Sequence, residues 1–170
     1  MARALRLPGD PDALEVRITP MRRRHLRGVL RIEQQVYPRP WTFGLFLSEI
    51  GQRTTRLYLV ARVGTEVVGY AGLFRAVDDG HITTVAVDPA WHRHGIGSRM
   101  LVALARGAVE RQCVNLTLEV RMSNSGAQAL YQRFGFVPAG VRKGYYPETR
   151  EDALVMWAND VDTPAYAERL

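Results

Sequence analysis

Apolar residues recur along the chain with two different spacings, which predicts a protein that mixes strands and helices. Alternating apolar and polar residues are typical of half-buried strands, and this alternation marks residues 14–19, 56–63 and 114–120. Further strands are expected at residues 67–77, 82–87, 136–143 and 153–157. Apolar residues three and four positions apart predict helices over residues 22–36, 43–50, 97–111 and 124–134.

Cap residues support the two shorter helices. Thr42 precedes the second helix as an N-cap. The apolar periodicity of this helix predicts that four side chains point inward: Phe43, Phe46, Leu47 and Ile50. Ser123 or Asn124 caps the last helix, and Gly135 follows it at the position where helices commonly end in a left-handed residue. Residues 145–147 are expected to form a loop, and residues 160–170 an acidic, frayed tail.

The predicted order of elements is βααβββαβαββ. Three consecutive strands joined by turns, followed by alternating helices and strands, indicate the α/β class with a mixed sheet. We expect one domain over residues 14–157, with flexible ends at 1–13 and 158–170.

Composition restricts the class of protein further. The chain has 170 residues, a net charge of +6 and one cysteine, Cys113. No window approaches the roughly 18 apolar residues of a membrane span, and no apolar run follows the N-terminal arginines. A lone cysteine fits a reducing compartment, so we expect a cytoplasmic protein. The histidines lack partners at metal-ligand spacing, and no metal site is expected. The basic charge indicates either a surface for nucleic acid or an ordinary solvated face.

The most informative stretch runs from residue 81 to residue 101. It predicts a buried strand, a turn with two glycines, and a helix whose unpaired N–H groups and dipole favour an anion. A Rossmann motif requires a third glycine where Met100 stands, and a Walker loop requires a lysine that is absent here. The turn is therefore either a phosphate site of another kind or an ordinary connection between strand and helix.

Residues 92–97 resemble the pyrophosphate loop of the GCN5-related N-acetyltransferases (the GNAT family), with His92 where that family has Gln or Arg. A second family motif matches at Asn124, Ala127, Leu130, Tyr131, Gly135 and Phe136. The resemblance covers residues 14–157 and implies the GNAT fold with acetyl-CoA as acetyl donor. The residues implied to bind it are Val85, Ala86, Val87, Arg93, His94, Gly95, Ile96, Gly97, Ser98 and Asn124.

Acetylation of an amine needs a base, because a protonated α-amine with a pKa of about 8 cannot attack a thioester. A carboxylate in a half-buried cleft has its pKa raised towards neutrality, and Glu119 lies near the end of a predicted strand. A tyrosine hydroxyl suits protonation of the leaving thiolate. The resemblance places base and acid at Glu119 and Tyr131. The alternatives are an exposed strand carboxylate and a core aromatic ring.

Within the family, the chain is most similar to enzymes that acetylate the N-terminal alanine of a small-subunit ribosomal protein, through residues 82–87, 116–121 and 145–153. Substrate contacts are then expected from two segments rich in aromatic residues and proline, with Tyr37, Pro38, Trp41, Tyr145 and Tyr146. The alternatives are a small-molecule or lysine acetyltransferase, and a non-catalytic module that docks on RNA or the ribosome. For an acetyltransferase we expect no direct role of nucleic acid and no membrane partner.

Overall fold

The protein was analysed as a computed structural model, which describes residues 15–170. Its strands are β1 (Val16–Pro20), β2 (Arg56–Val63), β3 (Glu66–Ala76), β4 (Asp79–Val87), β5 (Asn115–Arg121), β6 (Val137–Tyr146) and β7 (Glu151–Ala158). Its α-helices are α1 (Leu26–Val36), α2 (Phe43–Gly51), α3 (Ile96–Glu110), α4 (Ser125–Arg133) and α5 (Pro164–Ala167). Short 3-10 helices lie at Arg23–His25 and Pro89–Trp91. The end predicted at residues 1–13 lies outside the described residues, as does Leu14.

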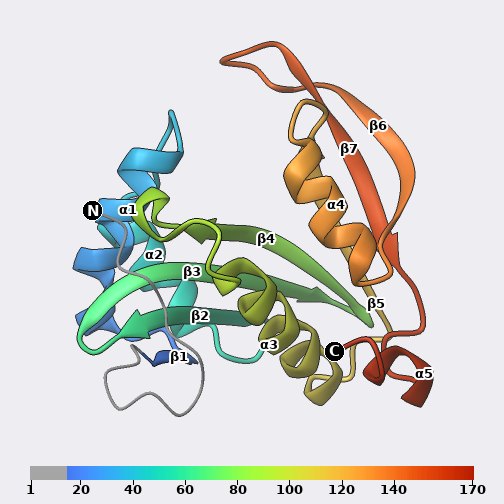
Figure 1. The fold of residues 1–170 in the computed structure, drawn as a ribbon, viewed down its shortest axis with the longest axis horizontal. Coiled ribbons are helices and arrows are strands. Elements are labelled where there is room, and N and C mark those ends of the chain that lie inside the picture. Colours follow the sequence, from blue (N-terminus) through green and yellow to red (C-terminus); the bar gives the residue numbers. More distant parts are fainter. Residues whose placement is uncertain (1–14) are drawn as a thin grey trace. The chain divides into compact units, whose positions relative to one another are not determined.

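The strands within the described residues form one sheet in the order β1-β2-β3-β4-β5-β7-β6 (Figure 1). Strands β4 and β5 pair in parallel, whereas β1 pairs with β2, and β7 with both β5 and β6, in antiparallel register. The mixed sheet and the predicted order βααβββαβαββ are confirmed, with α5 as an addition.

The described residues fall into two compact units. The first comprises residues 15–72 and 84–104, and the second comprises residues 73–83 and 105–170. Strands β3 and β4 and helix α3 each contribute residues to both units. No helix in the part of the chain that the structure describes is long and apolar enough to cross a membrane.

The core of the first unit joins α1 and α2 to the strands. Its buried side chains are Met21, Leu26, Val29, Ile32, Phe46, Tyr58, Val60, Val67, Tyr70 and Ala86. Thr42 caps α2 as predicted, since its hydroxyl accepts a hydrogen bond from the Leu45 N–H at 3.2 Å. The inward prediction is correct for Phe46 but wrong for Phe43 and Leu47, which are 40% and 36% exposed.

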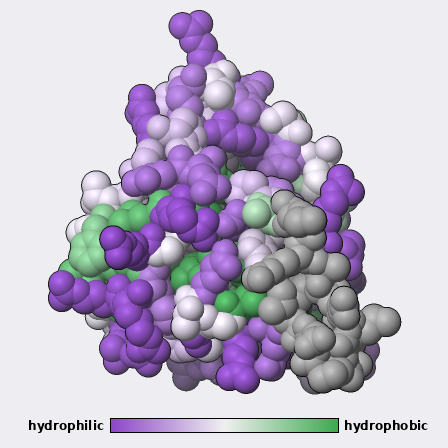
Figure 2. Space-filling view, turned by 60° about the vertical axis from the view of Figure 1, so that its left-hand side comes forward, coloured by the Kyte–Doolittle hydropathy of each residue, from purple (hydrophilic) through white to green (hydrophobic). Residues whose placement is uncertain are grey.

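Helices α1 and α2 also carry large apolar side chains that are exposed to solvent. These are Val36, Phe43, Leu45 and Leu47. Figure 2 shows the face turned forward from the left-hand side of Figure 1, where hydrophobic residues gather in patches among predominantly hydrophilic ones. Helical periodicity thus marks an apolar stripe on α2 without showing how much of that stripe the rest of the protein covers.

The second unit follows the strand pattern closely. Leu116, Leu118 and Val120 are buried on β5, as the alternation predicts. Residues 160–170, expected to fray, include α5, where the Tyr166 hydroxyl donates a 2.7 Å hydrogen bond to the Phe134 carbonyl oxygen. Gly135 follows α4 with φ of +85°, in the left-handed conformation that glycine adopts without strain.

Candidate functional site

The glycine turn leads directly into α3. Arg93 and Gly95 have φ of +63° and +72°, and α3 begins at Ile96. A Cβ atom at Gly95 would meet no other atom within 4 Å, so the turn requires glycine for its backbone conformation rather than for space. The first N–H groups of a 15-residue helix follow at once. This arrangement suits a phosphate group, as the sequence predicts.

Hydrogen bonds hold the backbone on both sides of this turn. The buried Asp88 accepts from the Ala90 N–H at 3.0 Å and from Arg31 Nη1 at 2.7 Å. Burial alone would raise the pKa of Asp88, but its hydrogen bonds to Arg31 and Ala90 outweigh burial and lower it. The imidazoles of His92 and His94 donate to the carbonyl oxygens of Val87 and Trp91, at 3.1 and 3.0 Å. Both rings therefore support the turn.

The end of β4 carries the predicted residues Val85, Ala86 and Val87. Neighbouring β3 approaches it closely at Gly69, where a Cβ atom would lie 3.0 Å from the Ala86 carbonyl oxygen and 3.0 Å from the Met100 methyl group. A glycine at this position therefore lets α3 pack directly against β3 beside the end of β4. The same packing fixes where the helix N-terminus lies relative to Val85–Val87.

The first predicted substrate segment is anchored by a glutamate that the sequence analysis did not assign to the site. Glu33 is 5% exposed and accepts hydrogen bonds from the Trp41 N–H at 3.1 Å and from the Tyr70 hydroxyl. Burial, and then the hydrogen bond with Glu33, raise the pKa of Tyr70 well above its usual value, so its hydroxyl remains a donor. The Tyr37 hydroxyl lies 2.9 Å from Thr84 Oγ1 on β4.

A signal for Glu33 was present in the sequence. The residue lies on the apolar stripe of the first predicted helix, with Leu26, Val29, Leu30 and Val36. A charged residue on a buried stripe needs hydrogen-bond partners, because desolvation is costly.

On the first predicted substrate segment, Pro38 is exposed, while Tyr37 and Trp41 are partly buried. The Trp41 ring lies 5.2 Å from that of Phe46.

In the second unit, Glu119 contacts two basic side chains from other strands. Its Oε2 lies 2.5 Å from His81 Nε2 on β4, and its Oε1 lies 3.2 Å from Arg142 Nε on β6. The Glu119 side chain is 9% exposed. It is therefore not the exposed strand carboxylate of the alternative interpretation.

Tyr131 and Asn124 lie on and beside α4. The Tyr131 side chain is buried, with its ring 5.8 Å from that of Phe136. Asn124 Oδ1 accepts a 3.1 Å hydrogen bond from the Ala127 N–H and caps the helix. Both predicted residues thus have structural contacts, and their catalytic and cofactor roles stay predictions.

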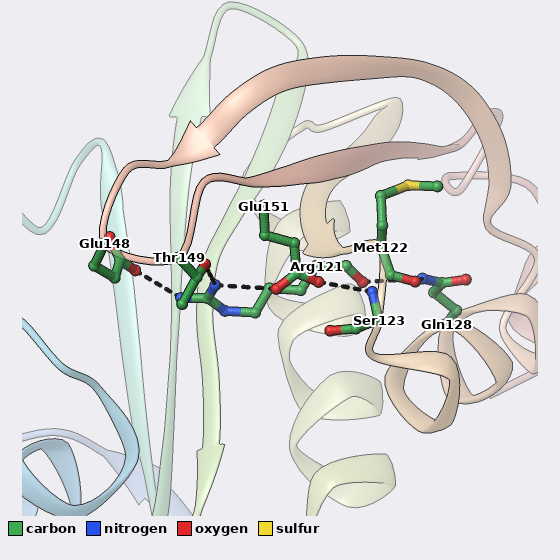
Figure 3. A network of polar contacts seen from close by, with 7 residues as sticks. All are labelled: Arg121, Met122, Ser123, Gln128, Glu148, Thr149 and Glu151. Carbon is green, nitrogen blue, oxygen red and sulfur yellow. Dashed lines mark hydrogen bonds and ion pairs between the residues drawn. The ribbon is translucent and has the colours of Figure 1, made fainter.

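The second predicted substrate segment is held by Arg121 (Figure 3). This arginine binds Glu148 at 2.7 Å, Thr149 at 2.9 Å and Glu151 at 3.3 Å, and its guanidinium lies 3.9 Å from the centre of the Tyr146 ring. Glu151 also accepts a 2.8 Å hydrogen bond from the Ser123 N–H. One side chain at the end of β5 thus fixes the turn between β6 and β7.

The prediction of a loop at residues 145–147 is wrong for the first two of these residues. Tyr145 and Tyr146 are the last residues of β6, and their rings meet edge to face at 5.1 Å. Burial, and then the nearby charge of Glu119, raise the pKa of Tyr145. The true turn comes after Tyr146.

Within residues 15–170, no cluster of three or more His, Cys, Asp or Glu side chains could hold a metal ion.

Comparison with known proteins gives matches over most of the chain. The model of a family described as "Acetyltransferase (GNAT) family" matches residues 26–136. A putative ribosomal protein bS18-alanine N-acetyltransferase of Bacillus subtilis (strain 168) is 36% identical over 137 residues, covering 81% of this chain and 91% of that relative. The ribosomal protein bS18-alanine N-acetyltransferase of Escherichia coli (strain K12) is 35% identical over 133 residues, covering 77% and 88%.

A solved structure is also similar. The crystal structure of the ribosomal-protein-S18-alanine N-acetyltransferase from Escherichia coli matches with a TM-score of 0.78 and 32% identity. The match covers 86% of this chain and 94% of that one. Similarity of sequence and of fold therefore extends over nearly the full length of these relatives.

Proposed function

The chain belongs to the acetyltransferase (GNAT) family and is an acetyl-CoA-dependent N-acetyltransferase, and we propose that its acceptor is the N-terminal alanine of a ribosomal protein. One observation carries this proposal. Two relatives at 35–36% identity, matched over 88–91% of their lengths, are named for acetylation of alanine in ribosomal protein bS18. We place the reaction in the cytoplasm, where ribosomal proteins are made.

In the proposed mechanism, the turn at residues 93–98 and the N–H groups that begin α3 hold the anionic part of acetyl-CoA. The backbone of Val85–Val87 holds the chain that leads to the thioester, beside the packing that Gly69 permits. Asn124 caps α4 and so fixes the start of the helix that carries Tyr131. Acetyl-CoA supplies the activated acyl group, and the side chains of the protein move the protons.

Proton transfer is assigned to Glu119 and Tyr131. Glu119 accepts a proton from the α-ammonium group, and the neutral amine attacks the thioester carbonyl carbon. The carbon–sulfur bond breaks, and the hydroxyl of Tyr131 donates a proton to the departing thiolate. The contacts of Glu119 with His81 and Arg142 support this assignment, because they fix a largely buried carboxylate in one orientation.

The two aromatic segments are assigned to recognition of the substrate peptide. Glu33 holds Trp41 by its N–H, and Arg121 holds Tyr146 by its ring face. Each segment is therefore held in part by a side chain from a neighbouring helix or strand. Tyr37, Pro38 and Tyr145 complete the proposed contacts. Rigid aromatic side chains offer contact area at a low cost in conformational entropy.

Peptide acetylation tests the proposal directly. The protein is mixed with acetyl-CoA and a peptide that begins with alanine, or with an N-terminally blocked peptide that contains lysine. Peptide mass and released thiol are both measured. We expect one acetyl group on the alanine peptide alone. Acetylation of the lysine peptide instead would identify a side-chain acetyltransferase and refute the proposed acceptor.

A further inference from the structure

We propose that His81 positions the Glu119 carboxylate for proton transfer. This inference rests on the proposed function of Glu119 as the base. It adds a residue that the sequence analysis did not assign to the site. The evidence is the geometry around the carboxylate.

Three strands contribute to this geometry. His81 on β4 pairs with Thr117 on parallel β5, and Glu119 lies two residues further along β5, on the same face as Thr117. Arg142 comes from β6, which is separated from β5 by β7 in the sheet order. The carboxylate is thus held from two sides by residues far apart in sequence.

The two contacts differ in closeness and exposure. His81 Nε2 lies 2.5 Å from Glu119 Oε2, whereas Arg142 Nε lies 3.2 Å from Oε1. The His81 side chain is 31% exposed and that of Arg142 is 59% exposed. The shorter contact comes from the less exposed partner, so the imidazole has the stronger effect on the direction of the carboxylate.

The contact with the imidazole then determines how the carboxylate is oriented for proton transfer. When the imidazole donates its Nε2–H to Oε2, it fixes the direction of the carboxylate, which can still take a proton from the ammonium group. Without this donor, the longer contact with the more exposed Arg142 remains, and it fixes the carboxylate less well.

Further charged or titratable groups lie near this cluster. From β6, Arg142 and Tyr145 face Glu119. On β4 itself, Asp79 lies two residues before His81 and accepts a 3.0 Å hydrogen bond from Asn115. The β7 residue paired with Glu119 is Val155, which does not titrate. Arg142 is the other side chain that contacts this carboxylate, so it is the matched comparison for His81.

The test compares kcat and KM of His81→Ala, His81→Gln and Arg142→Gln at neutral pH. Glutamine keeps a donor near the position of Nε2. We expect His81→Ala to lower kcat roughly ten-fold or more, with the KM for acetyl-CoA unchanged. We expect His81→Gln to retain most of kcat, because its amide can still donate to the carboxylate.

Arg142→Gln is the matched control, because it changes the longer and more exposed contact of the same carboxylate. It is expected to lower kcat less than His81→Ala does. A small loss in Arg142→Gln beside a large loss in His81→Ala and recovery in His81→Gln would support the inference. An unchanged kcat in His81→Ala would overturn it, as would a kcat in His81→Gln as low as that in His81→Ala.

Glu119→Gln separates this inference from the proposed function. If Glu119→Gln remains fully active, Glu119 is not the base and both proposals fall. If Glu119→Gln is inactive while both His81 variants match the unmodified protein, only the inference about His81 falls. Thermal unfolding of each variant shows whether it is folded. If His81→Ala does not fold, the test rests on His81→Gln.

Discussion

Two largely buried glutamates, one in each compact unit, differ in the chemistry of the groups that contact them. Glu33 is buried, and the partners described above are neutral donors: the Trp41 N–H and the Tyr70 hydroxyl. Glu119 is also largely buried, but its partners are an imidazole and a guanidinium that both reach solvent.

The difference lies in what each carboxylate is able to do. Glu33 accepts hydrogen bonds from Trp41 and Tyr70 and so holds the segment around Trp41. Glu119, the proposed base, contacts two basic side chains. Burial alone therefore does not identify a catalytic carboxylate, and the chemistry of its partners is the more useful criterion.

The largest effect is expected from Glu119→Gln. The amide has the shape of the carboxylate but cannot accept the ammonium proton, so kcat should fall about 10²–10⁴-fold. Stopped assays of acetylated peptide measure the rate, and calorimetric binding of acetyl-CoA serves as the control. A variant that keeps more than half of the original kcat would show that Glu119 is not the base.

Glu33→Ala should act on stability instead. The substitution leaves the Tyr70 hydroxyl and the Trp41 N–H without their acceptor, and it should lower the free energy of unfolding by ~1–3 kcal/mol. Urea denaturation measures this change. Adding Tyr70→Phe removes one stranded donor, so the double variant should lose less than the sum of the two single variants. Strictly additive losses would show that Glu33 and Tyr70 are not coupled.

Arg121→Ala should have a smaller effect, restricted to the peptide. The variant loses the contacts with Glu148, Thr149 and Glu151 and the packing on Tyr146, so the turn after β6 becomes less well fixed. We expect the KM for the peptide to rise roughly three- to ten-fold, since such partly exposed contacts contribute ~1 kcal/mol. The KM for acetyl-CoA should not change. An equal rise in both constants would contradict a role in peptide recognition.

The smallest effect at neutral pH is expected from Tyr166→Phe. Burial raises the pKa of Tyr166 from 10.0 to about 12, against a smaller opposing influence of Arg169. The folded protein therefore holds this proton more tightly than the unfolded chain, and stability should decline as pH rises from 10 towards 12. Denaturation at several pH values should show that part of this decline is lost in Tyr166→Phe. An identical alkaline decline in both proteins would assign it to other groups.

Much of the fold follows from local patterns in the sequence. Alternation on β2 and β5 gives two strands nearly residue by residue, and Thr42 and Asn124 cap the helices they were expected to cap. Such features depend on neighbours in the chain, so sequence alone is informative. The sequence pattern did not predict the last residues of β6. The strand continues beyond Gly144, whose φ is +58°, and its pairing with β7 is irregular there.

The candidate site was predictable only in part. Glu119 and Tyr131 were assigned through the family resemblance, but the partners of Glu119 come from β4 and β6. No local spacing relates His81 or Arg142 to residue 119, since these contacts depend on the pairing of strands distant in sequence. The role of Arg121 was missed for the same reason, because three of its partners lie 27 to 30 residues further along the chain.

Helix α1 supports two proposed binding regions at once. Its Arg31 pairs with Asp88 at the start of the glycine turn, and its Glu33 holds Trp41 on the peptide segment. Any displacement of this helix is therefore transmitted to the donor and acceptor regions together. We expect heterotropic linkage between the two substrates: occupation of either region should change the affinity of the other by the same factor, so that their binding energies do not simply add.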